Sequence, residues 1–421
     1  MTMRSNSQNN RHKHRQKNGK GQMQMKSIAE FFRNLFSGNS EITYKDKILK
    51  HRLHILYRCA LIFILVFVII AAVKVQINNR VYSEFEVIEE NSREGTENSI
   101  YENYDGNLLV HSKDGITAFD KKGVKLWNQP YEMQNPIVRI AGQYVAVGDY
   151  RGSIIYIMDV SGLKSQVNTD MIIQDFTISE KGVVTAILDR GDSTLIRLIS
   201  AEGTTIIDMR TSMADNGYPL AASLSQDNLK LGVSYLKAKN AQINTSIAFY
   251  NFGDVGQNKS ENLVSGYNVE EEVIPFLKYV NSTTAVALGN EKLLIFKGKQ
   301  IPELFREVTI EEEVQSIYYS ENHVALVFHN TSSDEKYRVE VYDVSGKQEC
   351  SFLTDVEYKE ILIKNNDLIV YNESSVEMYN TKGEKKYKGS FGENVSVIMP
   401  LTGRGKFLVV KENTIETIRL R

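Results

Sequence analysis

A recurring turn constrains the fold of this chain more than any other feature of its sequence. The turn follows a pair of short apolar strands, begins with Asp, Asn or Ser and ends with Gly, at residues 120–123 (DKKG), 159–162 (DVSG), 200–203 (SAEG), 343–346 (DVSG) and 380–383 (NTKG). The first side chain can hydrogen-bond its own backbone, and Gly accepts a positive φ. Consecutive copies lie 39 and 41 residues apart at the front and 37 apart at the back. The chain after residue 77 is therefore repetitive.

The repeat predicts an all-β fold for residues 78–421. A period of about 40–50 residues with about four strands is typical of a propeller blade. Aligning the strand before each hairpin yields eight starts: Leu108, Tyr144, Val183, Leu231, Ala285, Val324, Leu368 and Phe407. We therefore predict a β-propeller of eight blades, with seven blades and one hairpin outside the ring as the alternative.

The two ends of the repetitive region predict how the ring closes. The final unit stops at residues 420–421, one strand short, whereas an unassigned strand at 85–88 precedes the first unit. Pairing these two would satisfy both free edges. Two stacked sandwich domains would need a linker near the middle, which the sequence lacks, and a solenoid would use shorter repeats of about 20–30 residues.

Ahead of the repeats lies a run of fifteen uncharged residues, 59–73. Fifteen helical residues cover about 22 Å, less than the ~30 Å hydrocarbon core, but the stems of Arg58 and Lys74 can reach the interface. We predict a membrane-spanning helix at 53–77. A buried helix of a soluble domain would show a polar face. A cleaved signal peptide would need a shorter preceding region than the 58 residues present here.

Charge predicts the direction of this span. Residues 1–58 carry thirteen Lys/Arg and three Asp/Glu, a balance of +10, whereas residues 78–421 carry 36 basic and 49 acidic residues, a balance of −13. The positive-inside bias places the N-terminus in the cytoplasm and the C-terminal domain outside. The tail at 1–26 is predicted to be disordered. It lacks the interleaved aromatic residues of a nucleic-acid binder, so we expect anionic lipid headgroups as its partner and no nucleic acid.

The juxtamembrane segment at 27–52 contains an amphipathic pattern. Its apolar residues share one helical face: Ile28, Phe31, Phe32, Leu35 and Phe36. Residues 27–30 match a capping box, and Gly38 can end the helix. We predict that this face lies on the membrane surface. Docking on a partner helix is the alternative.

Two groups of residues in the repetitive region are candidates for interaction. The acidic triplets around Glu271 and Glu312 precede apolar strands in equivalent repeats, so the repeat predicts that they share one rim of the ring. They could bind a cation or a basic partner, or form a solvated rim. Tyr218, Pro219 and Tyr235 could be contact anchors on the longest blade, and packing is an equal alternative.

Several motifs resemble a family of single-pass membrane proteins of Gram-positive anaerobes that carry an extracytoplasmic propeller of unknown function. The motifs are residues 106–110 (GNLLV), 114–116 (DGI), 123–128 (GVKLWN), 217–220 (GYPL) and 224–227 (LSQD). The last resembles the Ser-Pro-Asp-Gly turn of other propellers, with Gln226 and Asn228 in place of Pro and Gly. The resemblance covers residues 82–421 and the preceding helix. It implies the fold and the topology but no activity.

The pattern of residues does not favour catalysis. Metal-site spacings, nucleophile motifs and phosphate loops are absent from the sequence of residues 78–421. Quinone-dependent propeller enzymes need a stacking Trp in the central funnel, but Trp127 falls on a predicted outer strand, where it would pack between blades. We therefore expect no enzyme, no metal and no cofactor. The prediction is a membrane-anchored module that binds protein or cell-wall polymer at the cell envelope. A sensor that signals to a cytoplasmic partner is the second hypothesis, and an enzyme the third.

Overall fold

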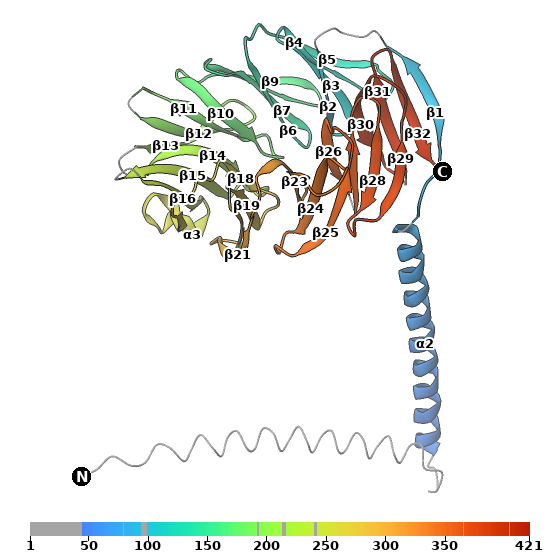
Figure 1. The fold of residues 1–421 in the computed structure, drawn as a ribbon. Coiled ribbons are helices and arrows are strands. Elements are labelled where there is room, and N and C mark those ends of the chain that lie inside the picture. Colours follow the sequence, from blue (N-terminus) through green and yellow to red (C-terminus); the bar gives the residue numbers. More distant parts are fainter. Residues whose placement is uncertain are drawn as a thin grey trace, which may run out of the picture. The chain divides into compact units, whose positions relative to one another are not determined.

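A computed structural model describes residues 44–78, 80–93, 99–191, 193–212, 216–239, 242–364, 366–403 and 405–421. These residues belong to two units, with the boundary between Ile77 and Asn78 (Figure 1). The predicted basic tail at 1–26 and the predicted membrane-surface face of Ile28, Phe31, Phe32, Leu35 and Phe36 lie outside the described residues. Both therefore stay predictions.

The first unit contains a single long described helix, α2 (Tyr44–Asn78). It starts before the predicted span of 53–77 because residues 44–52 contain no Gly or Pro and include several good helix formers. Within it, His51–Val73 has a mean hydropathy of 2.8 over 23 residues, and none of this segment is buried. Large apolar side chains such as Phe63 are exposed, in this case to 76%. The helix has the length and composition of a membrane anchor or a signal sequence.

The second unit is a β-propeller. Its described strands form eight four-stranded antiparallel sheets, which confirms eight blades rather than seven. Blades 1 to 4 comprise, in order, β2 (Ile100–Tyr104), β3 (Asn107–His111), β4 (Gly115–Phe119) and β5 (Lys125–Pro130); β6 (Pro136–Ala141), β7 (Tyr144–Asp149), β8 (Ile154–Asp159) and β9 (Gly162–Asn168); β10 (Ile172–Ile178), β11 (Val184–Asp189), β12 (Thr194–Ile199) and β13 (Thr205–Thr211); β14 (Tyr218–Leu224), β15 (Lys230–Lys239), β16 (Gln242–Asn251) and β17 (Leu263–Val269). A short helix α3 (Asp254–Gln257) and a 3-10 turn η1 (Ser260–Asn262) connect β16 to β17.

Blades 5 to 7 continue the same order. They comprise β18 (Phe276–Tyr279), β19 (Thr284–Leu288), β20 (Lys292–Lys297) and β21 (Glu303–Thr309); β22 (Val314–Tyr319), β23 (His323–His329), β24 (Tyr337–Asp343) and β25 (Gln348–Thr354); β26 (Glu360–Lys364), β27 (Asp367–Tyr371), β28 (Val376–Asn380) and β29 (Lys385–Gly389). First strands of most neighbouring blades contact one another, so the first strands surround the central axis, and the fourth strands lie outside.

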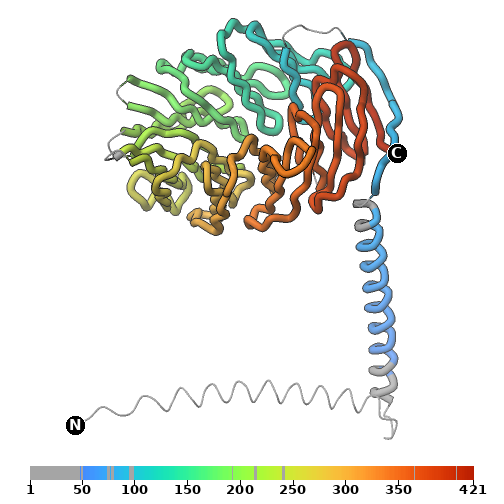
Figure 2. Tube along the Cα trace, in the orientation of Figure 1, coloured from blue at the N-terminus to red at the C-terminus, as the bar shows by residue number. Residues whose placement is uncertain are grey.

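Blade 8 is assembled from both ends of the unit. Its strands β30 (Val395–Pro400), β31 (Lys406–Lys411) and β32 (Thr414–Leu420) are completed by β1 (Phe85–Ser92) as the outer strand. Pairing runs from Phe85 opposite Leu420 to Ser92 opposite Thr414, with a bulge between Val87 and Glu89. Figure 2 shows this early strand, in blue, beside the red C-terminal strands. The predicted closure by the strand at 85–88 is confirmed.

The predicted repeat is also confirmed in its details. Each of the eight predicted starts falls within one residue of the start of a blade's second strand. The five Gly-ended turns join the third and fourth strands of their blades. In the first of them, Asp120 Oδ1 accepts hydrogen bonds from the backbone N–H groups of Lys122 and Val124, each at 2.8 Å, and Gly123 has φ +83°. The side chain of Asp120 thus forms the turn, and glycine supplies the left-handed φ.

The core lies between blades. Middle strands are covered on both sides by their neighbours, so β19 is buried at every position, whereas the outer strand β21 is largely exposed. This explains why the middle strands appear in the sequence as continuous apolar runs. Trp127 on β5 is 9% exposed and lies in one cluster with Tyr104 of its own blade and Val147 of blade 2. It packs between blades, as predicted.

Candidate functional site

Antiparallel strands divide the connections of the ring between two faces. One face carries the connections from each outer strand to the next inner strand, together with the turns between second and third strands. We call it the crossover face. The opposite face carries the remaining turns. On the crossover face a cavity of about 350 Å³ lies between blades 6 and 7, and we call it the Glu377 cavity.

A buried carboxylate lies at the centre of this cavity. Glu377 on β28 has a side chain only 2% exposed, and it accepts hydrogen bonds from Tyr379 Oη at 2.5 Å and Thr354 Oγ1 at 2.8 Å. The ammonium groups of Lys385 and Lys388 each lie 3.0 Å from its Oε1. Burial on its own would raise the pKa, but these hydrogen bonds outweigh it and lower the pKa of Glu377 from 4.5 to about 2. Glu377 is therefore ionised near neutral pH.

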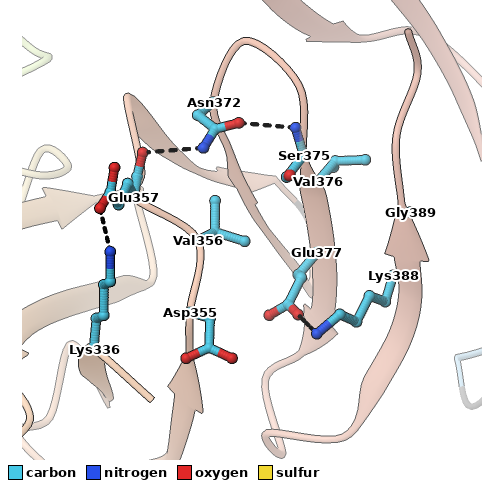
Figure 3. A pocket seen from close by; sticks show the side chains of 10 residues that line it. All are labelled: Lys336, Asp355, Val356, Glu357, Asn372, Ser375, Val376, Glu377, Lys388 and Gly389. Atoms are coloured by element: carbon cyan, nitrogen blue, oxygen red, sulfur yellow. Dashed lines mark hydrogen bonds and ion pairs between the residues drawn. The ribbon is translucent and has the colours of Figure 1, made fainter. Parts of the chain in front are cut away.

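The rim of the cavity presents further polar groups from three connections (Figure 3). Lys336 pairs with the Glu357 carboxylate. Asn372 donates from Nδ2 to the Glu357 carbonyl at 3.3 Å and accepts from the Ser375 N–H at 2.8 Å. Among the residues drawn, the Asp355 carboxylate makes no hydrogen bond or ion pair. Since donors and acceptors alternate around the opening, the arrangement suits a polar ligand that offers both.

A second cavity opens at the centre of the opposite face, with a volume of about 210 Å³. Gln226 Nε2 donates to Glu180 Oε1 at 3.2 Å and to Glu321 Oε1 at 3.5 Å. Turns from blades 3, 4 and 6 thus meet across the axis. In the part of the chain that the structure describes, no group of three His, Cys, Asp or Glu residues could hold a metal ion.

The predicted aromatic candidates lie on strands rather than loops. Tyr218 and Pro219 belong to the inner strand β14, and Pro219 pairs with Tyr235 on β15. Tyr235 is 1% exposed, and its hydroxyl lies 3.1 Å from that of Tyr250. Pro219 is buried and Tyr218 half-buried. For Tyr235 and Pro219 the structure corresponds to the packing alternative.

The two acidic candidates share the crossover face but not a site. Glu271 lies between β17 and β18. Its carboxylate accepts from Gln242 Nε2 at 3.5 Å, and its backbone N–H donates to Asn244 Oδ1 at 2.9 Å. Glu312 lies between β21 and β22 and accepts from Arg338 Nη2 at 2.9 Å. Their partners belong to blades 4 and 6, respectively, so the structure does not bring the two carboxylates onto a common partner.

Sequence reasoning missed Glu377 and the lysines around it. Glu377 lies on the third strand of its blade, at a position that is also charged in three other blades, as Arg197, Glu340 and Glu416. A charged residue in a strand that is otherwise buried on both sides was the available signal, because such a charge must find partners.

Similarity to known proteins supports the fold and the family. Among solved structures, Sqt1 from Saccharomyces cerevisiae has a TM-score of 0.51 at 12% identity, over 82% of this chain and 99% of that one. BamB from Moraxella catarrhalis has a TM-score of 0.48 at 11% identity, over 80% of this chain and 100% of that one. At this identity the likeness to Sqt1 concerns the fold alone, and nothing is inferred from the likeness to BamB.

Sequence comparison identifies the family. No curated protein sequence matches the chain. The model of DUF5711, described as a family of unknown function, matches residues 78–420. This match covers the whole propeller except its last residue. The chain therefore belongs to the DUF5711 family of unknown function.

Proposed function

We propose that this protein is a membrane-anchored binding or scaffolding module of the cell envelope, with the N-terminus in the cytoplasm and the propeller outside. Propeller folds commonly act as binding scaffolds. The resemblance to single-pass membrane proteins of Gram-positive anaerobes supports this proposal. It includes no catalysis, no cofactor and no nucleic acid.

The anchor is supported by helix α2 and the charge around it. Its apolar window His51–Val73 is longer than the ~20 residues that a spanning helix needs. The +10 balance of residues 1–58 favours retention of that side in the cytoplasm. The α2 helix would then hold the propeller at the outer surface, with lipid as its first partner.

The Glu377 cavity is the observation that carries the binding role. Its Glu377 anion is satisfied internally, so it serves to orient Lys388 rather than to react. Lys388 is 63% exposed and Lys336 52% exposed, so both ammonium groups face solvent near the Asp355 carboxylate. Such a surface fits a segment of protein or cell-wall polymer that carries both donors and acceptors.

A crosslinking experiment tests the binding role. A photo-crosslinking amino acid is placed at Asp355 beside the cavity or at Glu202, an exposed turn residue on the opposite face. Illumination of intact cells should yield a defined envelope adduct, either protein or cell-wall polymer, only from position 355. Lys388→Ala should weaken that adduct, whereas Lys382→Ala on the opposite face should not. Equal adducts from both positions, or none from either, would contradict the proposal.

Protease treatment of intact cells tests the topology. Residues after 78 should be degraded while the tail remains protected. A surviving propeller with a cut tail would overturn the orientation.

A further inference from the structure

A third cavity lies where the ring closes, between blade 1 and the composite blade 8. Its volume of about 570 Å³ falls within the ~300–1,000 Å³ of small-molecule sites. We call it the closure cavity. Blade 1 contributes Val110, Thr117, Phe119 and Asn128, and the closing side contributes Arg93 and Ile415.

Arg93 is held in a fixed orientation at this cavity. It directly follows β1, and its guanidinium carbon lies 4.5 Å from the centre of the Tyr101 ring. Its Nη2 donates to the Tyr101 hydroxyl at 2.8 Å. Its Nη1 is buried and has no hydrogen-bond partner among the described residues. A buried donor left unpaired is destabilising, and a charged one more so. The free nitrogen therefore favours an external acceptor.

Other groups that line the cavity also favour an external hydrogen-bond acceptor. Thr117 donates to Asn128 Oδ1 at 2.7 Å, which fixes the amide so that Nδ2 remains a donor. Arg93 and Lys125 are cationic, and neither forms an ion pair in the described part of the chain. One carboxylate, Asp114, also lines the cavity. The balance is one positive charge, beside apolar surface from Val110, Phe119 and Ile415.

We propose that the closure cavity binds a small carboxylate with an apolar body. Arg93 Nη1 donates a charge-assisted hydrogen bond to the carboxylate, the Asn128 amide is the second donor, and the apolar body packs on Phe119 and Ile415. This site is separate from the Glu377 cavity and does not depend on its role.

Binding there would also stabilise the ring. Arg93 follows the closing strand β1, and Asn128 belongs to blade 1, so one ligand contacts both sides of the closure. A ligand that binds only the folded state stabilises it, by about 2.7 kcal/mol at a concentration one hundred times Kd. The melting temperature should therefore rise with ligand concentration.

The test uses the full chain in detergent with 3-phenylpropionate and its uncharged counterpart 3-phenylpropionamide, measured by calorimetric titration. The carboxylate should bind, and the amide should bind at least about tenfold more weakly, as expected for a lost charge-assisted hydrogen bond. Arg93→Gln should weaken carboxylate binding by a similar factor. Arg151→Gln is the matched control, because Arg151 also stacks on a tyrosine, Tyr150 at 5.5 Å, but does not line the cavity.

A second variant protects the test from a folding defect in Arg93→Gln. Thr117→Tyr leaves Arg93 in place and fills the cavity with a side chain suited to a strand. It should abolish binding and the ligand-dependent rise in melting temperature. Absence of binding at millimolar carboxylate, or binding that survives both Arg93→Gln and Thr117→Tyr, would overturn the proposal.

Discussion

Blade 3 and blade 8 have the same four-stranded sheet but are assembled differently. In blade 3 the strands β10 to β13 follow one another, and tight turns connect them. In blade 8 the outer strand β1 comes from the opposite end of the unit and pairs with β32 without a connecting turn. Outer strands bury little surface in both blades. The ring therefore closes through one non-covalent strand pair, β1 with β32, which we call the closing joint. In every other blade the chain itself connects the third strand to the fourth.

Removing β1 should have the largest effect on this comparison. A chain that starts at Ser99 leaves the edge of β32 unpaired and uncovers neighbouring apolar residues. We expect the cooperative thermal transition to disappear, or its midpoint temperature to fall by ~10 °C or more, because the free energy of unfolding drops by several kcal/mol. Circular dichroism melting measures this. A chain that starts at Asn78 keeps β1 and is the control. An unchanged transition in the shorter chain would show that β1 is dispensable.

Single core substitutions should show how the closing joint differs from the interior of blade 3. Phe391 is 2% exposed and lies 5.3 Å from the Phe85 ring of β1. Phe176 on β10 of blade 3 is 1% exposed. Replacing either with Ala should lower the free energy of unfolding by about 3–5 kcal/mol. Only Phe391→Ala should also speed hydrogen exchange in β1, because it loosens the joint. Equal exchange in both variants would contradict a special role for the closure.

The joint between blades 6 and 7 should respond to pH through Glu377. Because its pKa is lowered to about 2 in the folded state, its stabilising contribution is present above pH 4.5 and is lost as the pH falls from there through about 2. Glu377→Gln should cost about 1–3 kcal/mol at neutral pH. In denaturant titrations, the free energy of unfolding of this variant should depend less on pH between 4.5 and about 2 than that of the wild type. If the free energy of unfolding of Glu377→Gln had the same pH dependence as the wild type, Glu377 would not be the group responsible for it.

The smallest expected effect concerns the turn that blade 8 lacks. Gly203 connects β12 to β13 with φ +85°, a conformation that costs an L-residue about 1–2 kcal/mol. Gly203→Ala should lower the free energy of unfolding by that amount in chemical denaturation. Gly191→Ala, also at positive φ but with no atom within 4 Å of its added Cβ, isolates the backbone part. A Cβ added at Gly203 would also lie 3.1 Å from Ser165 Cβ, so the loss there should be at least as large as at Gly191, and a larger loss for Gly191→Ala would refute this crowding.

Much of the architecture was predictable because it repeats. The turn of Asp120 and the strand that starts at Tyr144 recur with the same local chemistry, so each blade supports the assignment of the next. The candidate sites were not predictable in the same way. Tyr235 lies on a strand buried on both sides, where alternation does not distinguish core from surface. Glu377 meets Lys388 because β28 pairs with β29 in blade 7, and it meets Thr354 only because blades 6 and 7 pack side by side.

The sequence by itself determined the propeller repeat, the positions of the second strands, the apolar helix and the closing role of residues 85–88. These depend on local periodicity and turn chemistry, which neighbouring residues encode. Only the tertiary structure decided between eight and seven blades, and it alone showed that Tyr235 is a core residue, that Glu377 is ionised although buried, and that Arg93 holds an unpaired donor beside a cavity. Those properties arise from burial and distance between separate blades, and no local pattern records them.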